Sequence, residues 1–206
     1  MKIRPMLLSL SAIILLPGLL AVASATQQSK ERLIQRLPVE ANEPIAITDI
    51  KVNDRSVSFD KKFSGDDEWL RSLVISVKNT SDKLILFASI RLQFPRSAGG
   101  SERFSIFQIS HGNAALPMRP PTHEERVVGI GPDETVEIRL SPQRFTDLRD
   151  FLSATQYPYS IEKVGLSIDE VIFQDDTMWY AGAISVRNPK EPGSWINSLY
   201  ANRKPQ

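Results

Sequence analysis

Hydrophobic and polar residues alternate most regularly between residues 69 and 95, in the run WLRSLVISVKNTSDKLILFASIRLQFP. Successive side chains of a β-strand point to opposite faces, so this alternation predicts two half-buried strands. Asn79-Thr80-Ser81-Asp82 separates them with short polar side chains that favour a turn. We therefore predict an antiparallel hairpin with one apolar face, which a second layer must cover.

Weaker alternation of the same kind predicts further strands. They are expected near residues 45–52, 57–59, 104–109, 126–130, 135–140, 161–173 and 178–186. Within residues 161–173 the phase changes between Ile168 and Val171, which indicates a β-bulge at Asp169-Glu170. If these strands form two stacked sheets, Leu86, Ile90, Val136 and Ile184 should share one interior.

One helix is predicted, at about residues 142–154. Ser141 is a suitable N-cap, and Pro142 suits the first helical position. Phe145, Leu148, Phe151 and Leu152 fall on one helical stripe. With about seven or eight short strands around it, this helix is expected to cross between sheets, and the pattern predicts an all-β, immunoglobulin-like antiparallel β-sandwich over residues 44–188.

The ends of the chain differ from this domain. Lys2 and Arg4 precede an apolar run that ends in Ala23-Ser24-Ala25, a pattern typical of a cleaved secretory signal over residues 1–25. An uncleaved membrane anchor is the alternative, since the run approaches spanning length. Residues 26–43 are expected to form a polar leader or short helix, and residues 189–206 a proline-containing tail.

Composition narrows the classes of partner. The chain has no cysteine, so no disulfide stabilises it and no lipid can be attached through a thiol. It has 25 basic and 24 acidic residues, and this balance argues against nucleic acid. After signal cleavage we expect no stable membrane span and a periplasmic or extracellular location; the oligomeric state stays open.

Three runs carry a resemblance: VKNTSDKLILFASIRLQFP, GIGPDETVEIRL and VIFQDDTMWYAGAISVRNP. They resemble segments of uncharacterised exported bacterial proteins with an immunoglobulin-like β-sandwich, in which a polar turn joins two strands and a Pro-Asp turn precedes a later one. The resemblance implies an exported sandwich domain, and it implies no activity.

Aromatic residues are the main candidate binding residues. Trp179 is expected on the solvent face of the last strand, and Tyr157, Tyr159 and Trp195 on loops or the tail. Exposed rings with polar edges are typical of sugar and protein contacts. In the alternative, Trp195 folds back onto Trp179 and Phe87 and has a packing role.

Candidates for metal and catalytic chemistry are few. The acidic residues Asp66, Asp67, Asp175 and Asp176 are weak candidates for a shared calcium ion, although neither pair fits a calcium-binding loop. His111 and His123 lack the spacing of a zinc site. No catalytic motif is present, so we expect no cofactor.

The resulting hypothesis is a non-enzymatic, exported domain that binds a protein or cell-envelope component through loops or an edge strand containing Ile106. The alternative is a carbohydrate-binding module or hydrolase that uses Trp179, Tyr157 or Tyr159. A calcium-dependent adhesin is a third possibility.

Overall fold

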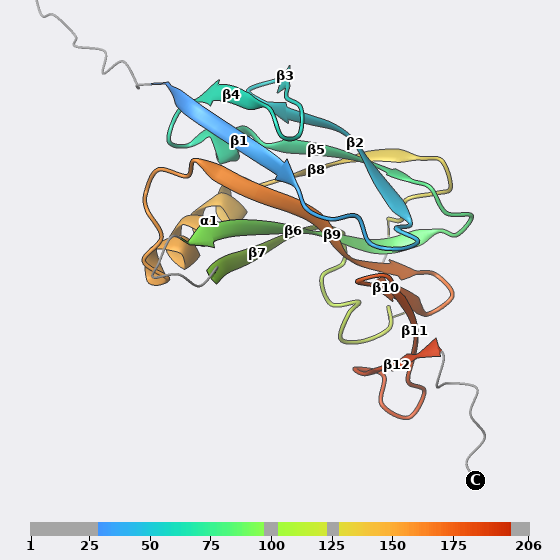
Figure 1. Cartoon of the computed structure of the whole chain (residues 1–206). Coiled ribbons are helices and arrows are strands. Elements are labelled where there is room, and N and C mark those ends of the chain that lie inside the picture. The colour runs from blue at the N-terminus through green and yellow to red at the C-terminus, as the bar shows by residue number, and fades with distance from the viewer. Residues whose placement is uncertain (1–28, 97–102, 123–127, 199–206) are drawn as a thin grey trace, which may run out of the picture.

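A computed structural model describes residues 29–96, 103–122 and 128–198, which form two β-sheets, one α-helix and a short 3-10 helix (Figure 1). The larger sheet contains β1 (Lys30–Arg36), β4 (Lys62–Gly65), β6 (Ile85–Arg96), β7 (Arg103–Gly112), β9 (Lys163–Phe173), β10 (Thr177–Tyr180), β11 (Ala183–Arg187) and β12 (Trp195–Asn197). The smaller sheet contains β2 (Ile45–Val52), β3 (Arg55–Ser56), β5 (Val74–Asn79) and β8 (Thr135–Arg139). The predicted all-β class with one α-helix is confirmed for these residues.

Strand β9 is the centre of the larger sheet. One of its edges pairs with β6, which carries β7 on its far side. The other edge is shared: β1 pairs with it in parallel at residues 163–166, and β10 pairs antiparallel at residues 170–172. Beyond β10, strands β11 and β12 extend away from the two-sheet body (Figure 1).

The main core lies between the two sheets. The smaller sheet contributes Ile75 and Val77 from β5, and the larger sheet contributes Ile90 and Leu92 from β6. All four side chains are buried. Because the chain has no disulfide, burial of apolar surface in this shared core is the principal stabilising contribution.

The predicted hairpin of residues 69–95 is wrong, because β5 and β6 belong to different sheets. Trp69–Ser72 forms the 3-10 helix η1, so the first strand begins only at Val74. β5 pairs with β2 and β8, while β6 pairs with β7 and β9. The polar segment after Asn79 therefore carries the chain from one sheet to the other.

The side chain of Asn79 holds this crossing in place. Asn79 is buried, and its Nδ2 donates to the carbonyl oxygens of Lys83, at 2.8 Å, and Ile130, at 2.9 Å. Its Oδ1 accepts from the backbone N–H of Ser81 at 2.9 Å. The asparagine side chain thus adds hydrogen bonds to backbone groups on both sides of the crossing; the carbonyl oxygen of Ile130 also accepts from the N–H of Ile85.

The shared interior predicted for four residues is confirmed for two of them. Ile90 lies in the main core and Val136 packs against it. Leu86 instead lies in a second cluster with Phe87, because a register shift between Ile85 and Phe87 changes the phase of β6. Ile184 is 38% exposed, since β11 lies beyond the main core.

Several element predictions also change. Residues 30–36 form strand β1 rather than a leader or short helix. The segment 178–186 is a hairpin of β10 and β11, whose turn at Ala181 and Gly182 has positive φ at both residues. The tail includes strand β12. Of residues 126–130, only 128–130 are described, and Ile130 forms an isolated bridge with Ile85.

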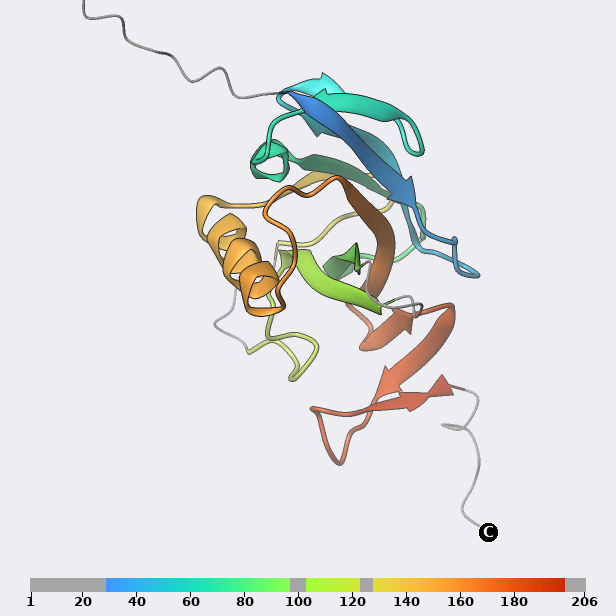
Figure 2. The same cartoon turned by 60° about the vertical axis from the view of Figure 1, so that its left-hand side comes forward.

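Two predictions of local structure are confirmed. The register shift opposite Ser89 and Ile90 leaves Asp169 as the extra residue of a β-bulge in β9. Helix α1 (Pro142–Ala154) begins after Ser141, whose Oγ accepts from the N–H of Arg144 at 3.2 Å. α1 joins β8 in the smaller sheet to β9 in the larger, and Figure 2 places it beside one end of both sheets.

The predicted signal over residues 1–25 lies outside the described residues. Among the residues described, no helix combines the length and apolarity that crossing a membrane requires.

We expect Asn79→Ala to lower the free energy of unfolding by about 2 kcal/mol, because it removes the amide hydrogen bonds to the carbonyl oxygens of Lys83 and Ile130 and leaves the N–H of Ser81 without its acceptor. Urea denaturation followed by circular dichroism measures the change. Asp82→Ala, three residues along at an exposed position, is the control and should have little effect. Equal stability of the two variants would contradict this role for Asn79.

Candidate functional site

Strand β7 forms a long open edge of the larger sheet. It contains ten residues, and within the described ranges it pairs with β6 alone. The other strands at sheet margins are shorter: β3, β4, β8 and β12 have two, four, five and three residues. A long unpaired edge presents backbone donors and acceptors that can bind another strand.

The contacts of Gln108 identify which β7 residues face this edge. Its carbonyl oxygen accepts a 2.5 Å hydrogen bond from Arg144 Nη2 of α1, so its backbone groups point away from β6. Alternate residues of a strand share this direction, which gives the same orientation to Phe104, Ile106 and Ser110. Within the described part of the chain, no hydrogen bond engages the outward backbone groups of these three residues.

The same alternate residues place their side chains on the outer face of the sheet. Phe104 is 42% exposed and Ile106 is 47% exposed. Ser105, Phe107 and Ile109 point the other way, and the Phe107 ring lies 6.0 Å from the Phe151 ring of α1. The open edge is therefore bordered by two exposed apolar side chains, while the opposite face of β7 is covered.

A buried carboxylate ties β7 to the centre of the sheet. The side chain of Asp169, in the bulge of β9, accepts hydrogen bonds from Arg91 of β6 and Gln108 of β7. Asp169 is buried, and its partners come from the two neighbouring strands. These hydrogen bonds hold the outer-face side chains of β6, β7 and β9 together beside the open edge.

The pKa of the neighbouring Glu170 carboxyl group is raised. Burial, with a further contribution from the negative charge of Asp169, raises the pKa of the Glu170 carboxyl group to about 7, and Arg187 opposes the shift. This shift could not be expected from the sequence, because it depends on the pairing of β6, β9 and β10.

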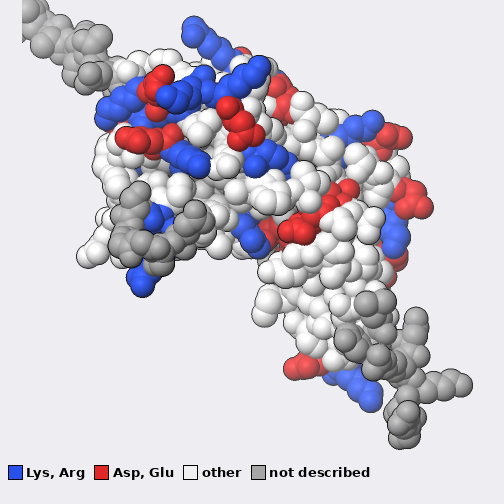
Figure 3. Space-filling model, in the orientation of Figure 1, with Lys and Arg blue, Asp and Glu red and all other residues white. Residues whose placement is uncertain are grey.

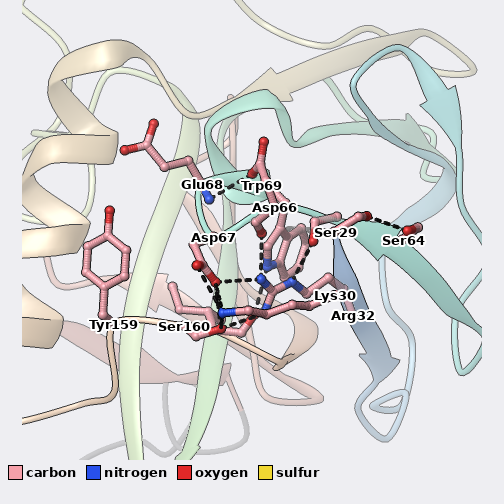
Figure 4. Close-up of polar contacts among 12 residues, drawn as sticks. Ser29, Lys30, Arg32, Ser64, Asp66, Asp67, Glu68, Trp69, Tyr159 and Ser160 are labelled. Carbon is pink, nitrogen blue, oxygen red and sulfur yellow. Dashed lines mark hydrogen bonds and ion pairs between the residues drawn. The ribbon is translucent and has the colours of Figure 1, made fainter. Parts of the chain in front are cut away.

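A second network surrounds Arg32, whose side chain is 0% exposed (Figure 4). Its guanidinium group donates to the carbonyl oxygens of Gly65, Asp66 and Ile161, at 2.8–3.2 Å. It also donates to Ser160 Oγ at 2.9 Å and Asp67 Oδ1 at 2.7 Å. One side chain of β1 thereby joins the loop after β4 to the segment that leads into β9.

This network explains the positions of two calcium candidates. Asp67 accepts a hydrogen bond from Ser160 and pairs with Arg32 and Lys30, and these contacts hold the pKa of its carboxyl group well below the usual range. Asp66 Oδ1 accepts from the N–H of Glu68. These acidic side chains are engaged in protein contacts that need no ion.

The other two calcium candidates lie elsewhere. Asp175 pairs with Lys83 at 2.6 Å and Asp176 with Arg187 at 3.1 Å. Within the described ranges, no group of three or more potential metal ligands is present, and the two acidic pairs do not meet. His111 is the penultimate residue of β7, while His123 lies outside the described residues.

The expected exposure of Trp179 is wrong. Trp179 is 0% exposed, belongs to the main core, and donates from Nε1 to the carbonyl oxygen of Ala41 at 3.0 Å. The next residue, Tyr180, is 48% exposed, so Trp179 is the buried member of this pair. A sugar cannot stack on this indole in the folded protein.

The remaining aromatic candidates occupy three different environments. Trp195 packs in the cluster with Phe87, as the packing alternative predicted for this pair, although Trp179 is in the other cluster. Tyr157 is partly buried against Phe94, with ring centroids 5.8 Å apart. Tyr159 is 65% exposed under the guanidinium group of Arg149. The four predicted aromatic residues therefore do not form one binding surface.

Basic and acidic side chains are interspersed over the face that contains β1 and β9 (Figure 3). This face has no broad area of a single charge sign, in keeping with the near-neutral composition.

Comparison of the chain with protein-family models, with curated proteins and with solved structures gives no match.

We expect Arg32→Met to lower the free energy of unfolding by about 3 kcal/mol, because the carbonyl oxygens of Gly65 and Asp66 lose their side-chain donor and Asp67 loses its guanidinium partner. Chemical denaturation measures the loss. Lys62→Met, which removes an exposed cation 2.7 Å from Glu31, is the matched control and should have no measurable effect. A similar loss of stability in both variants would show that the buried Arg32 contacts contribute no more than the exposed Lys62–Glu31 ion pair.

The raised pKa of Glu170 predicts a pH-dependent stability. The folded protein retains the proton up to about pH 7, whereas an ordinary glutamate loses it near 4.5. The stabilisation linked to this proton is therefore complete below pH 4.5 and is lost as the pH rises through 7.

We expect Glu170→Gln to remove on the order of 1 kcal/mol of this dependence between pH 5 and 8, after allowance for partial exposure of the group. Thermal unfolding of both proteins across this range measures it. Glu191→Gln, at an exposed loop position, should leave the pH profile as in the wild type. Parallel profiles for wild type and Glu170→Gln would contradict the assignment.

Proposed function

We propose that this protein is an exported, non-enzymatic β-sandwich domain that binds an extended segment of a protein or cell-envelope partner along the open edge of β7. The observation that carries the proposal is the unpaired edge itself, with outward backbone groups at Phe104, Ile106 and Ser110. An incoming strand would hydrogen-bond to these groups and extend the larger sheet, taking the place of Arg144 at the carbonyl oxygen of Gln108.

The side chains beside the edge support this mode of binding. Phe104 and Ile106 lie two residues apart on one face, so a paired strand would place alternate side chains next to them. Contacts to exposed apolar side chains add affinity and selectivity to the backbone hydrogen bonds.

The rigidity of β7 also supports the proposal. Its outer face is tied to β9 through Gln108 and Asp169, and its inner face packs on α1 through Phe107 and Phe151. A preorganised edge loses little conformational entropy when a partner binds.

The immunoglobulin-like arrangement is part of the same proposal. Its support is the packing of two mainly antiparallel sheets around one core, with chain crossings between them after Asn79 and through α1. Export rests on the N-terminal signal pattern of the sequence.

We expect Ile106→Pro to reduce capture of the partner at least about tenfold, because proline removes an outward N–H and places its ring where the partner strand would lie. The protein should remain folded, since the hydrogen bonds between β7 and β6 involve the alternate residues. Quantitative affinity capture from a cell-envelope extract, followed by mass spectrometry, measures the change, and circular dichroism verifies the fold.

Ile106→Val retains the N–H and an apolar side chain, so it should capture the same partner as the wild type. If folded Ile106→Pro captures what the wild type captures, or if the wild type enriches nothing over a resin control, the proposed function is wrong.

A further inference from the structure

Two adjoining hollows lie at the end of the larger sheet where β6 stops and β7 and β9 begin. Their volumes are about 720 Å³ and 300 Å³. Both are lined by Pro95, Arg96, Arg103 and Lys163. The larger has the size of a small-molecule binding site.

Three cations from three strands meet at the boundary between the hollows. Arg96 ends β6, Arg103 begins β7, and the two are direct partners in the register of these strands. Lys163 begins β9 two residues before Gly165, which pairs with Gln93 of β6. The antiparallel register therefore brings Lys163 to the same end of the sheet.

This arrangement is electrostatically unfavourable when nothing is bound. Like charges directly opposite each other on paired strands destabilise a sheet. Among the carboxylates of the described residues, none forms an ion pair with Arg96, Arg103 or Lys163. Glu162 also lines the larger hollow, but its single negative charge does not balance the three cations, and the lining has an excess of positive charge.

The other walls carry uncharged polar groups on a fixed frame. Gln156, Tyr157 and Ser160 line the larger hollow. The ring of Tyr157 is held against Phe94, and Ser160 is held by Arg32 and Asp67 (Figure 4). Hydroxyl and amide groups beside a cluster of cations suit a ligand that has both an anionic group and hydroxyl groups.

We propose that these hollows bind a small sugar that carries an oxyanion, either a phosphate or a carboxylate. The oxyanion would lie among Arg96, Arg103 and Lys163, because guanidinium groups donate two parallel hydrogen bonds to such groups. The sugar hydroxyls would contact Gln156 and Tyr157. The smaller hollow shares Phe104 with the open edge of β7, but the cations and the polar groups of the larger hollow lie outside that edge, and the inference does not depend on the proposed function.

The test is isothermal titration of the full chain, at constant ionic strength, with glucose 6-phosphate, glucuronate, inorganic phosphate and glucose. We expect saturable binding of at least one of the two charged sugars and at least about tenfold weaker binding of glucose. Which charged sugar binds more tightly distinguishes a phosphate site from a carboxylate site.

Arg103→Gln and Lys163→Gln should each weaken binding of that sugar about tenfold or more, because each removes a charge-assisted contact. Lys190→Gln changes the net charge equally at a remote exposed position and should bind as the wild type does. Arg103 is exposed, and its replacement removes the repulsion from Arg96, so the melting temperature of Arg103→Gln should equal or exceed that of the wild type.

Three results would overturn the proposal: no binding of either charged sugar, binding that Arg103→Gln and Lys163→Gln leave unchanged, or inorganic phosphate bound as tightly as the charged sugars. The last result would show an anion site without a role for the hydroxyl groups.

Discussion

The pairing of β9 along both of its edges is the constraint on which the rest of the structure depends. β6 occupies one edge, and β1 and β10 divide the other. A strand with neighbours on both sides must have a defined register with each of them. At Asp169 the bulge shifts the register of β9 with β6 by one residue. The bulge also turns a carboxylate toward Arg91 and Gln108, so the irregularity in the central strand anchors the strand at the margin.

Alternation in the sequence located most strands but could not assign them to sheets. The phase of Val74–Asn79 and Ile85–Arg96 is real, yet a polar turn between two strands is compatible with a hairpin or with a crossing between layers. The crossing between layers is stabilised by Asn79, whose side-chain amide donates to the carbonyl oxygens of Lys83 and Ile130. Contacts of this kind join residues far apart in sequence, and local pattern holds no information about them.

The candidate site was predictable to different degrees. A short edge strand near Ile106 was expected, because the run around it alternates weakly beside a proline-rich loop, and the structure places Ile106 on an exposed strand margin. Trp179 was misplaced because a turn at Ala181 and Gly182 divides what looked like one strand. The opposition of Arg96 and Arg103 needed the register of β6 with β7, although two arginines at the ends of neighbouring apolar runs were a visible signal.

The parallel pairing of β1 with β9 has a consequence for the order in which the protein can mature. Leu33 is the partner of Lys163, so β1, which pairs with the nearby β4 on one side, gains its second neighbour only after most of the chain has been made. Contacts this distant in sequence slow folding, because a long loop must close before they form. Until then Arg32 has its contacts with Gly65, Asp66 and Asp67 but lacks those with Ser160 and Ile161. The larger sheet therefore closes around β1 only when the carboxyl-terminal half of the chain supplies β9.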